Sequence, residues 1–219
     1  MERIYNFSPG PAALPASVLE QVRGELLDWQ STDLSVMEVS HRGKLFTELA
    51  AQSEATFRDL LDIPVHYKVM FLQGGATMQF AAVPLNLSGP DDTADYVNTG
   101  NWSKKAAGEA ERFLNVNVAA DGVDRNYVTI PDPATWQVSD EAKYLHLAVN
   151  ETVVGVEFHE LPEDSDAPLV ADMSSTLLSR PVDVNRFGLI YAGAQKNIGP
   201  AGITVVLSLI HISRCRRYS

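Results

Sequence analysis

The sequence predicts an α/β fold in which a mostly parallel sheet is covered by helices on both faces. Short apolar runs, typical of buried strands, alternate along the chain with stretches of helical periodicity. Several of these runs are almost continuously apolar, as expected for parallel strands that are buried on both faces. Because ligands bind at the carboxyl ends of the strands in such sheets, functional residues are expected just after the strands.

Size and composition narrow the class of protein. The 219 residues are 45% hydrophobic and 21% charged, which is the ordinary globular mixture and fits one large α/β domain. A net charge of −11 disfavours a nucleic-acid or membrane partner. No long apolar stretch or signal sequence is present, which predicts a soluble, cytoplasmic protein. The single cysteine, Cys215, and the histidine spacing predict no disulfide and no metal site.

Four helices are expected from the 3.6-residue period. The two N-terminal ones, Pro15–Trp29 and Arg42–Leu61, each carry an apolar stripe, and both are expected to be amphipathic and packed on the surface of the core. Two more, Thr77–Leu85 and Trp102–Phe113, are expected between strands. We place Pro84 at the end of the third helix, since proline interrupts a helix interior.

Seven strands are expected, and a stiff arm precedes the first helix. Three prolines in Phe7–Pro15 predict an extended segment that can lie over a binding site. The expected strands are Tyr67–Leu72, Ala94–Asn98, Val116–Ala119, Tyr144–Ala148, Leu169–Ala171, Leu189–Tyr191 and Gly202–Leu207.

The composition changes near the end of the chain. The last residues, Leu209–Ser219, contain three arginines and no acidic residue. This favours a foreign or frame-shifted terminus, and a genuine basic tail is the alternative. We therefore divide the chain into an N-terminal arm (residues 1–14), a ligand-binding large domain (15–206) and a tail (207–219).

One lysine is surrounded by small residues. Lys196 follows the apolar run Phe187–Ala192, and Gly193, Gly199 and Gly202 leave room near it. Desolvation lowers the pKa of a buried lysine and makes it an amine nucleophile that can bind a carbonyl cofactor. The alternative is an ordinary lysine that ends a strand and points to water.

A glycine-rich turn lies between an expected strand and an expected helix. The segment Gln73–Thr77 presents backbone N–H groups and a helix N-terminus, which together favour an anion such as phosphate. It lacks the Lys-Ser/Thr of a nucleotide loop and the third glycine of a dinucleotide fingerprint. A merely tight connection is the alternative.

Further side chains near strand ends add to the candidate site. Asp172 ends a buried run, so it is expected to meet a cation or several donors, unless it only caps the next turn. Trp102 is suited to stacking on a flat ligand and Thr152 to donating a hydrogen bond, although plain packing also explains both. His41 and Arg42 suit an anionic substrate or, alternatively, a solvated helix start.

Six motifs occur in order along the chain: Asn6–Ala12, Val36–Gly43, Leu72–Thr77, Ala94–Val97, Ala171–Thr176 and Tyr191–Gly202. The chain also has the parts that a pyridoxal phosphate site needs. They are a glycine-rich turn that can bind phosphate, an aromatic side chain that can stack on the cofactor ring, and an aspartate and a lysine at strand ends. From about residue 3 to about residue 206, the chain resembles the phosphoserine aminotransferases, which are class-V aminotransferases with the fold-type I architecture.

The resemblance implies roles around pyridoxal phosphate. Lys196 would hold the cofactor as a Schiff base and move the α-proton of the substrate. Asp172 would pair with the protonated ring nitrogen, Trp102 would stack on the ring, and Thr152 would bond the phenolic oxygen. The fold implied is a large domain around a seven-stranded sheet with a smaller C-terminal domain, which this sequence would lack together with part of the large one.

The resemblance also implies how anionic groups are held. The cofactor phosphate would be bound by Ala76, Thr77 and Gln195. The anionic groups of the substrate would meet Ser8, His41 and Arg42.

The reaction implied is reversible amino transfer from glutamate to 3-phosphohydroxypyruvate, which gives phosphoserine and 2-oxoglutarate in serine biosynthesis. The partners implied are therefore these small molecules and, for the full-length protein, a second copy in a homodimer. The alternatives are a truncated inactive fragment of that enzyme and a related fold-type I lyase. Such lyases often need a catalytic cysteine, whereas Cys215 lies in the tail.

Overall fold

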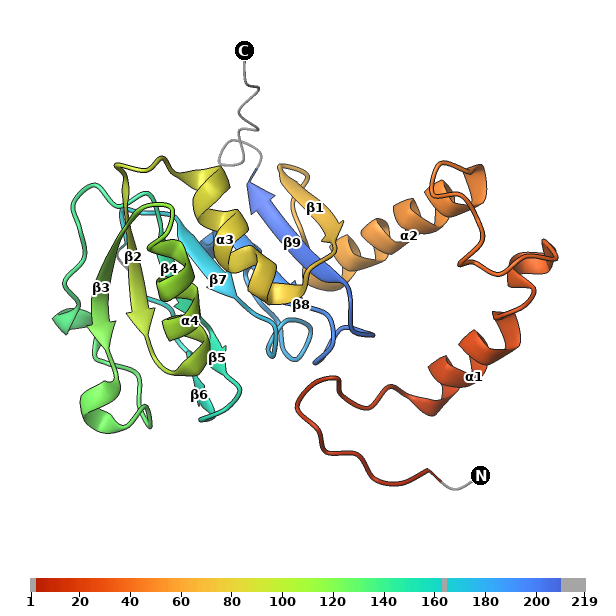
Figure 1. Ribbon diagram of the computed structural model, residues 1–219, viewed down its shortest axis with the longest axis horizontal. Helices are drawn as coiled ribbons and strands as arrows, with labels where there is room; N and C mark the ends of the chain where they lie inside the picture. Colours follow the sequence, from red (N-terminus) through yellow and green to blue (C-terminus); the bar gives the residue numbers. More distant parts are fainter. Residues whose placement is uncertain (1–2, 163–164, 210–219) are drawn as a thin grey trace, which may run out of the picture.

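A single seven-stranded sheet organises the computed structural model, which describes residues 3–162 and 165–209 (Figure 1). Across the sheet the strands follow the order β1-β9-β8-β7-β4-β2-β3. Their bounds are β1 Tyr67–Leu72, β2 Thr93–Asn98, β3 Asn115–Asp121, β4 Leu145–Ala148, β7 Leu169–Asp172, β8 Leu189–Gly193 and β9 Thr204–Leu209. All seven expected strands are confirmed.

Strand direction places most strand ends at the same edge. Strands β3, β2, β4, β7 and β8 pair in parallel, and β9 is antiparallel to both β8 and β1. Strand β1 therefore runs in the same direction as β8, and only β9 is reversed. The predicted mostly parallel sheet is confirmed, and the carboxyl ends of six strands lie at one edge.

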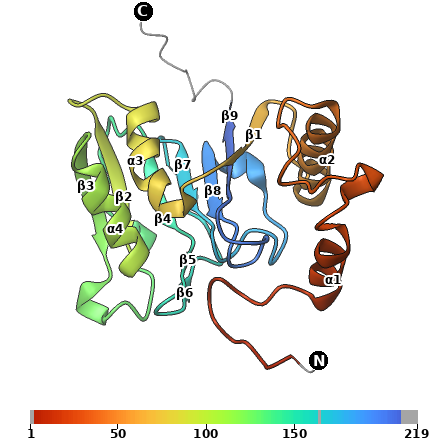
Figure 2. The ribbon, with the colours of Figure 1, turned by 45° about the vertical axis from the view of Figure 1, so that its right-hand side comes forward.

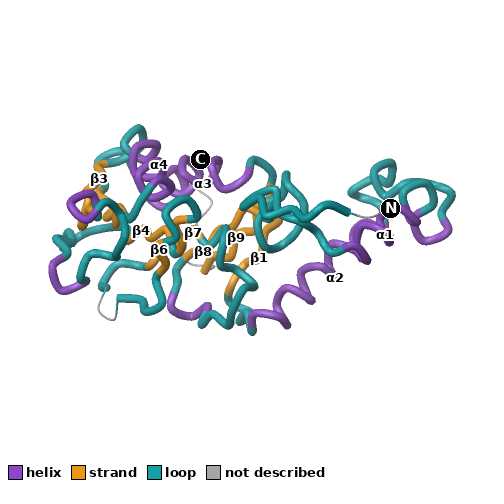
Figure 3. The backbone as a smooth tube through the Cα atoms, turned by 90° about the horizontal axis from the view of Figure 1, so that it is seen from below, coloured by secondary structure: helices purple, strands orange, loops and turns teal. Residues whose placement is uncertain are grey.

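Two helices cover one face of the sheet. Figure 3 shows α3 (Gly75–Leu87) and α4 (Asn101–Ala110) on the same side of the strands. Pro84 lies inside α3, so its expected place at the helix end is wrong. The helix continues to Leu87, and at its end the backbone N–H and the hydroxyl of Ser88 both donate to the Pro84 carbonyl, at 3.1 and 2.6 Å.

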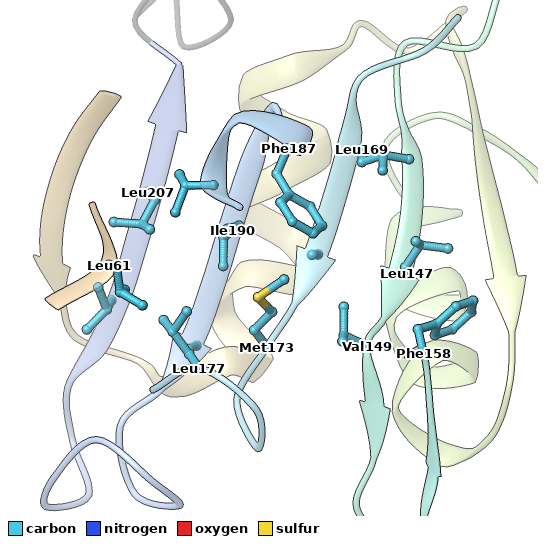
Figure 4. Packing of buried hydrophobic residues seen from close by; sticks show 14 of the residues in the cluster. Leu61, Leu147, Val149, Phe158, Leu169, Met173, Leu177, Phe187, Ile190 and Leu207 are labelled. Atoms are coloured by element: carbon cyan, nitrogen blue, oxygen red, sulfur yellow. The ribbon is translucent and has the colours of Figure 1, made fainter. Parts of the chain in front are cut away.

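The opposite face is covered by one helix and by loops. Helix α2 (Lys44–Leu61) adds Phe57 and Leu61 to the apolar core on this face, and Trp136 and Leu177 come from loops. Figure 4 shows this packing. The helices expected on both faces are therefore present, but on this face only the end of α2 contributes. Short 3-10 helices lie at Val123–Arg125, Pro133–Thr135 and Val184–Arg186.

Helix α1 (Ala16–Glu25) differs from its prediction. None of its residues is buried, and Val22, in its expected apolar stripe, is 53% exposed. Figures 1 and 2 show α1 and the start of α2 on the side of the molecule away from the sheet. The expected packing of α1 is wrong, because no residue of its apolar stripe is buried by the described part of the chain. The following 3-10 helix, Trp29–Ser31, does bury Trp29.

A second, two-stranded sheet follows β4 and was not predicted. Its strands are β5 (Asn150–Glu151) and β6 (Val156–Glu157), and the turn between them contains Gly155 at φ +79°. Each strand has two residues, too few to give a period. This hairpin places Thr152 beside the carboxyl edge of the large sheet.

The last described strand crosses an expected boundary. Strand β9 continues to Leu209, so the expected start of the tail at residue 207 falls within it. Residues 210–219, including Cys215, lie outside the described residues. Within the described part, no helix has the length and apolarity that crossing a membrane requires.

Candidate active site

A cavity of about 730 Å³ lies at the carboxyl edge of the sheet. Its walls come from the segments that follow β1, β2, β4, β7 and β8, because these strands all end at that edge. Seven of the ten expected site residues line it: Ala76, Thr77, Trp102, Thr152, Asp172, Gln195 and Lys196. Residues far apart in the sequence are thus brought together as the strand-end argument predicts.

The start of α3 forms one wall. Gly74 and Gly75 have φ angles of +98° and +66°, which glycine adopts without strain, and they turn the chain from β1 into the helix. The first N–H groups of a helix have no intrahelical partners, and within the described residues no side chain caps those of α3. At the end of β8, a Cβ on Gly193 would lie 3.4 Å from the backbone nitrogen of Ala76. The glycine thus leaves this anion-binding end uncrowded.

Asp172 ends β7 and is 7% exposed. Its Oδ1 accepts hydrogen bonds from the backbone N–H and hydroxyl of Ser174, at 2.9 and 2.6 Å, and the Ser174 hydroxyl oxygen accepts from the Gly193 N–H at 3.0 Å. Burial raises the pKa of Asp172, although the Ser174 bonds and the charge of Lys196 oppose this. A cation in the cavity would stabilise the carboxylate further.

Lys196 lies three residues beyond β8 and is partly buried. Its Nζ donates a hydrogen bond to the Thr152 hydroxyl and lies 5.1 Å from the ring centre of Trp102. Burial lowers the pKa of Lys196, while the negative charges of Asp172 and Glu151 act in the opposite direction. The net direction is a lowered pKa, which makes the neutral, nucleophilic amine more accessible than in an exposed lysine.

The N-terminal arm passes over this lysine. The Ala12 N–H donates to the Gln195 carbonyl at 2.8 Å, and a Cβ on Gly10 would lie 3.0 Å from Cγ of Lys196. The arm therefore lies over the site, as its prolines predict. Ser8 is exposed and does not line the cavity, and its N–H donates to the Asn6 side chain at 2.9 Å.

His41 and Arg42 lie outside the cavity. Both are exposed in the turn before α2, and neither is among the cavity-lining residues. Figure 1 shows the start of α2 away from the sheet. Their assignment to substrate, like that of Ser8, stays a prediction.

Two buried polar residues of this region were not predicted from the sequence. Ser174 orients Asp172, and Glu151 is fully buried beside Thr152. Each had a signal: Ser174 follows the strand-end aspartate by two residues, and Glu151 follows an apolar run that ends at Val149. The bond from Ser174 to Asp172 is local, but the Gly193 N–H that donates to Ser174 lies on another strand. The partners of Glu151 lie on α4, and the sequence does not reveal them.

The family model described as aminotransferase class-V matches residues 4–209. The chain belongs to the class-V aminotransferase family. Curated relatives are named phosphoserine aminotransferase, and that of Acidithiobacillus ferrooxidans is 59% identical over 206 residues. The match covers 94% of this chain and 57% of that protein. The relative from Hahella chejuensis is 56% identical with the same coverage.

Solved structures of phosphoserine aminotransferases match as well. The phosphoserine aminotransferase of Bacillus circulans subsp. alkalophilus superposes with a TM-score of 0.93 at 48% identity, over 97% of this chain and 59% of that one. A pyridoxal phosphate-bound phosphoserine aminotransferase from Trichomonas vaginalis gives 0.92 at 40%, over 99% and 61%. The chain thus spans about three-fifths of these structures.

Proposed function

We propose that this class-V aminotransferase chain belongs to a cytoplasmic phosphoserine aminotransferase that uses pyridoxal phosphate. One observation carries the proposal: Lys196, Asp172 and the uncapped start of α3 all open on the same cavity. An amine, a buried acid and an anion-binding helix end are the groups that such a cofactor requires. The names of the relatives supply the substrate class.

The residues present fit the proposed cofactor. The cavity volume falls within the range of small-molecule sites. The first N–H groups of α3, at Ala76 and Thr77, suit its phosphate, and Gln195 lines the same cavity. Within the described residues, the hydrogen bonds to the Asp172 carboxylate fall on Oδ1, which leaves Oδ2 for a protonated ring nitrogen. The ring of Trp102 supplies a flat surface.

Each side chain then has a task in the proposed reaction. When bound, the cofactor supplies an electron sink and carries the amino group between two half-reactions. The lowered pKa of Lys196 lets its Nζ hold the cofactor and then accept and return the α-proton. The buried carboxylate of Asp172 keeps the ring nitrogen protonated. The hydroxyl of Thr152 keeps Nζ within the cavity.

The proposed substrates follow from the names of the relatives. Glutamate gives up its amino group and becomes 2-oxoglutarate, and 3-phosphohydroxypyruvate gains that group and becomes phosphoserine. We assign Ser8, His41 and Arg42 to the anionic groups of these substrates, since arginine binds carboxylate and phosphate in a bidentate way. We also propose a homodimer, which is supported by the uncovered apolar side chains of α1.

Cofactor binding and turnover test the proposal together. We expect the protein to show the visible absorbance band of lysine-bound pyridoxal phosphate and glutamate-dependent formation of phosphoserine. Lys196→Ala should abolish the band and the turnover, whereas Lys68→Ala, at an exposed position of β1, should leave both unchanged. Absence of the band in the unmodified protein would refute the cofactor assignment. A band without turnover would refute the assigned activity for this chain and favour the inactive fragment.

A further inference from the structure

Glu151, on β5, is fully buried at the start of helix α4. Its Oε2 accepts the Trp102 N–H at 2.8 Å, and its Oε1 accepts the N–H and the hydroxyl of Ser103, both at 2.7 Å. A carboxylate in this position satisfies two unpaired N–H groups of the helix start and interacts favourably with the helix dipole. Both oxygens of the buried carboxylate are therefore hydrogen-bonded.

The backbone is shaped to admit this carboxylate. A Cβ on Gly100 would lie 2.8 Å from Cδ of Glu151, which is too close for any side chain without movement. The residue before α4 must therefore be small if the carboxylate is to reach the helix. This close approach fixes the β5 segment against the first turn of α4.

Both neighbours of this contact line the cavity. Trp102 is held through its backbone, and Thr152 is next to Glu151 in the sequence. These two residues contact the same amine, since the Lys196 Nζ donates to Thr152 and lies 5.1 Å from the Trp102 ring centre. Glu151 thus connects two walls of the cavity that meet at Lys196.

We propose that Glu151 is a positioning residue of the cofactor site, which holds the Trp102 ring and the Thr152 hydroxyl in a fixed arrangement around Lys196. It is not among the residues that line the cavity in the described part of the chain, so it acts through these neighbours. The link to pyridoxal phosphate rests on the proposed function. The link to Lys196 rests on the contacts alone.

The charge of Glu151 provides a second test of the proposal, because it affects the pKa of Lys196. Among the described residues, Asp172 and Glu151 both raise the pKa of Lys196 against the effect of burial. Lys105 also lies near the Trp102 ring, with its Nζ 4.9 Å from the ring centre. Removing the Glu151 charge while keeping the shape of the side chain should therefore lower the pKa of Lys196.

The first experiment follows Trp102 without cofactor. The protein is labelled with 5-fluorotryptophan, and the ¹⁹F resonance of Trp102 is assigned with Trp102→Phe. We expect Glu151→Gln to shift or broaden this resonance, because an amide cannot accept all three bonds, and Glu151→Asp, which keeps the charge, to restore it in part. An unchanged resonance in Glu151→Gln would overturn the proposal. If Glu151→Gln fails to fold, Glu151→Asp takes its place and must itself move the resonance.

Asp95 offers a matched control. It is a second buried carboxylate, 1% exposed, and it accepts the N–H and hydroxyl of Ser139, at 2.9 and 2.8 Å, and the Asn117 amide at 2.8 Å. It does not line the cavity. Asp95→Asn should therefore lower stability as Glu151→Gln does but leave the Trp102 resonance in place. If both variants changed the Trp102 resonance equally, the cause would be a general loss of packing and not the loss of a specific positioning role of Glu151.

The second experiment follows Lys196 and the cofactor. The pH profile of Lys196 modification by an amine reagent, read by peptide mass spectrometry, should move to lower pH in Glu151→Gln and stay in place in Asp95→Asn. Pyridoxal phosphate should bind Glu151→Gln about tenfold more weakly, as expected when charge-assisted hydrogen bonds are lost. A wild-type protein that binds no pyridoxal phosphate would refute the proposed function, while the Trp102 and Lys196 measurements would still decide the role of Glu151.

Discussion

The two faces of the sheet are built from the same strands but differ in chemistry. In β4, Leu145 and Leu147 point to the face covered by α2 and loops, and His146 points to the face under α3 and α4. The first face is mostly aliphatic, as Figure 4 shows. The second face contains His146, from β4, and three buried tyrosines. The tyrosines are Tyr96 from β2, Tyr144 just before β4, and Tyr191 from β8.

The polar groups of the helix-covered face bond mainly to one another. The Tyr96 and Tyr144 hydroxyls are 2.7 Å apart, and Nε2 of His146 is 2.8 Å from the Tyr191 hydroxyl. His146 also stacks on Tyr96, with ring centres 4.8 Å apart. Burial raises the pKa of all three tyrosines, so their hydroxyls stay neutral. Pairing makes the hydroxyls and Nε2 of His146 tolerable in the core, whereas Nδ1 of His146 has no hydrogen-bond partner within the described residues.

The difference shows how stability and function divide within one sheet. The aliphatic face supplies apolar burial, which is the main favourable term in folding. The polar face is covered by α3 and α4, and the first turns of both helices border the cavity. It also reaches the site directly, because Tyr191 pairs with Asp172 in the sheet and the charge of Asp172 contributes to the raised pKa of Tyr191.

The largest expected effect is a loss of packing on the aliphatic face. Leu147 is fully buried, so Leu147→Ala should lower the free energy of unfolding by about 3 kcal/mol, because it removes apolar contacts and leaves a cavity. Urea denaturation measures this change. Leu27→Ala, at a side chain that is 85% exposed, is the control and should have little effect. A Leu147→Ala effect as small as that of the control would contradict the assignment of this face as the main source of stability.

The next effect depends on pH and belongs to the polar face. Burial lowers the pKa of His146 from 6.5 to about 3, so the unfolded chain binds a proton more readily than the folded one between these values. His146 therefore contributes full stability above about pH 6.5, and acidification from about pH 7 to about pH 5 should remove about 2 kcal/mol of it.

A glutamine variant isolates this contribution. Urea denaturation of His146→Gln at both pH values should show a smaller acid-induced loss than the wild type, because the variant has no buried imidazole to protonate. His66→Gln, at an exposed position, should retain the wild-type pH dependence. An identical pH dependence in wild type and His146→Gln would show that the imidazole is not the group responsible.

Residues that depend on one local pattern were predicted well from the sequence. Strand β1 has the predicted bounds, Tyr67–Leu72, because a largely apolar run between polar loops marks a strand, although β1 lies at the edge of the sheet and three of its six residues are exposed. Asp172 and Lys196 share a cavity because Asp172 ends β7, Lys196 follows β8, and these two adjacent strands are parallel, as the sequence predicted for most of the sheet. The start of α3 at the Gly-Gly turn follows from the same logic.

The failures concern residues whose surroundings come from elsewhere in the chain. The apolar stripe of α1 predicts a packed helix, but its side chains stay partly exposed, since periodicity identifies a face and not its partner. His41 and Arg42 do not line the cavity, and their assignment to the substrate stays a prediction, because a cationic cluster does not indicate where its segment lies. Glu151 was missed because a glutamate after a strand is usually solvated, and its partners on α4 lie about fifty positions away in the sequence.

The smallest expected effect is the coupling between two hydroxyls of the polar face. Tyr96→Phe and Tyr144→Phe each leave one buried hydroxyl without its partner, so each single change should cost more than the hydroxyl it removes. The double variant removes both groups and should be more stable than the sum of the single changes predicts, by about 1 kcal/mol. Urea denaturation of the wild type, the two single variants and the double variant gives the four free energies of unfolding that this double-mutant cycle needs. Tyr5→Phe, at a side chain that is 91% exposed, is the control. Strict additivity would mean that the two hydroxyls contribute independently, and the polar face would then be tolerated for reasons other than pairing.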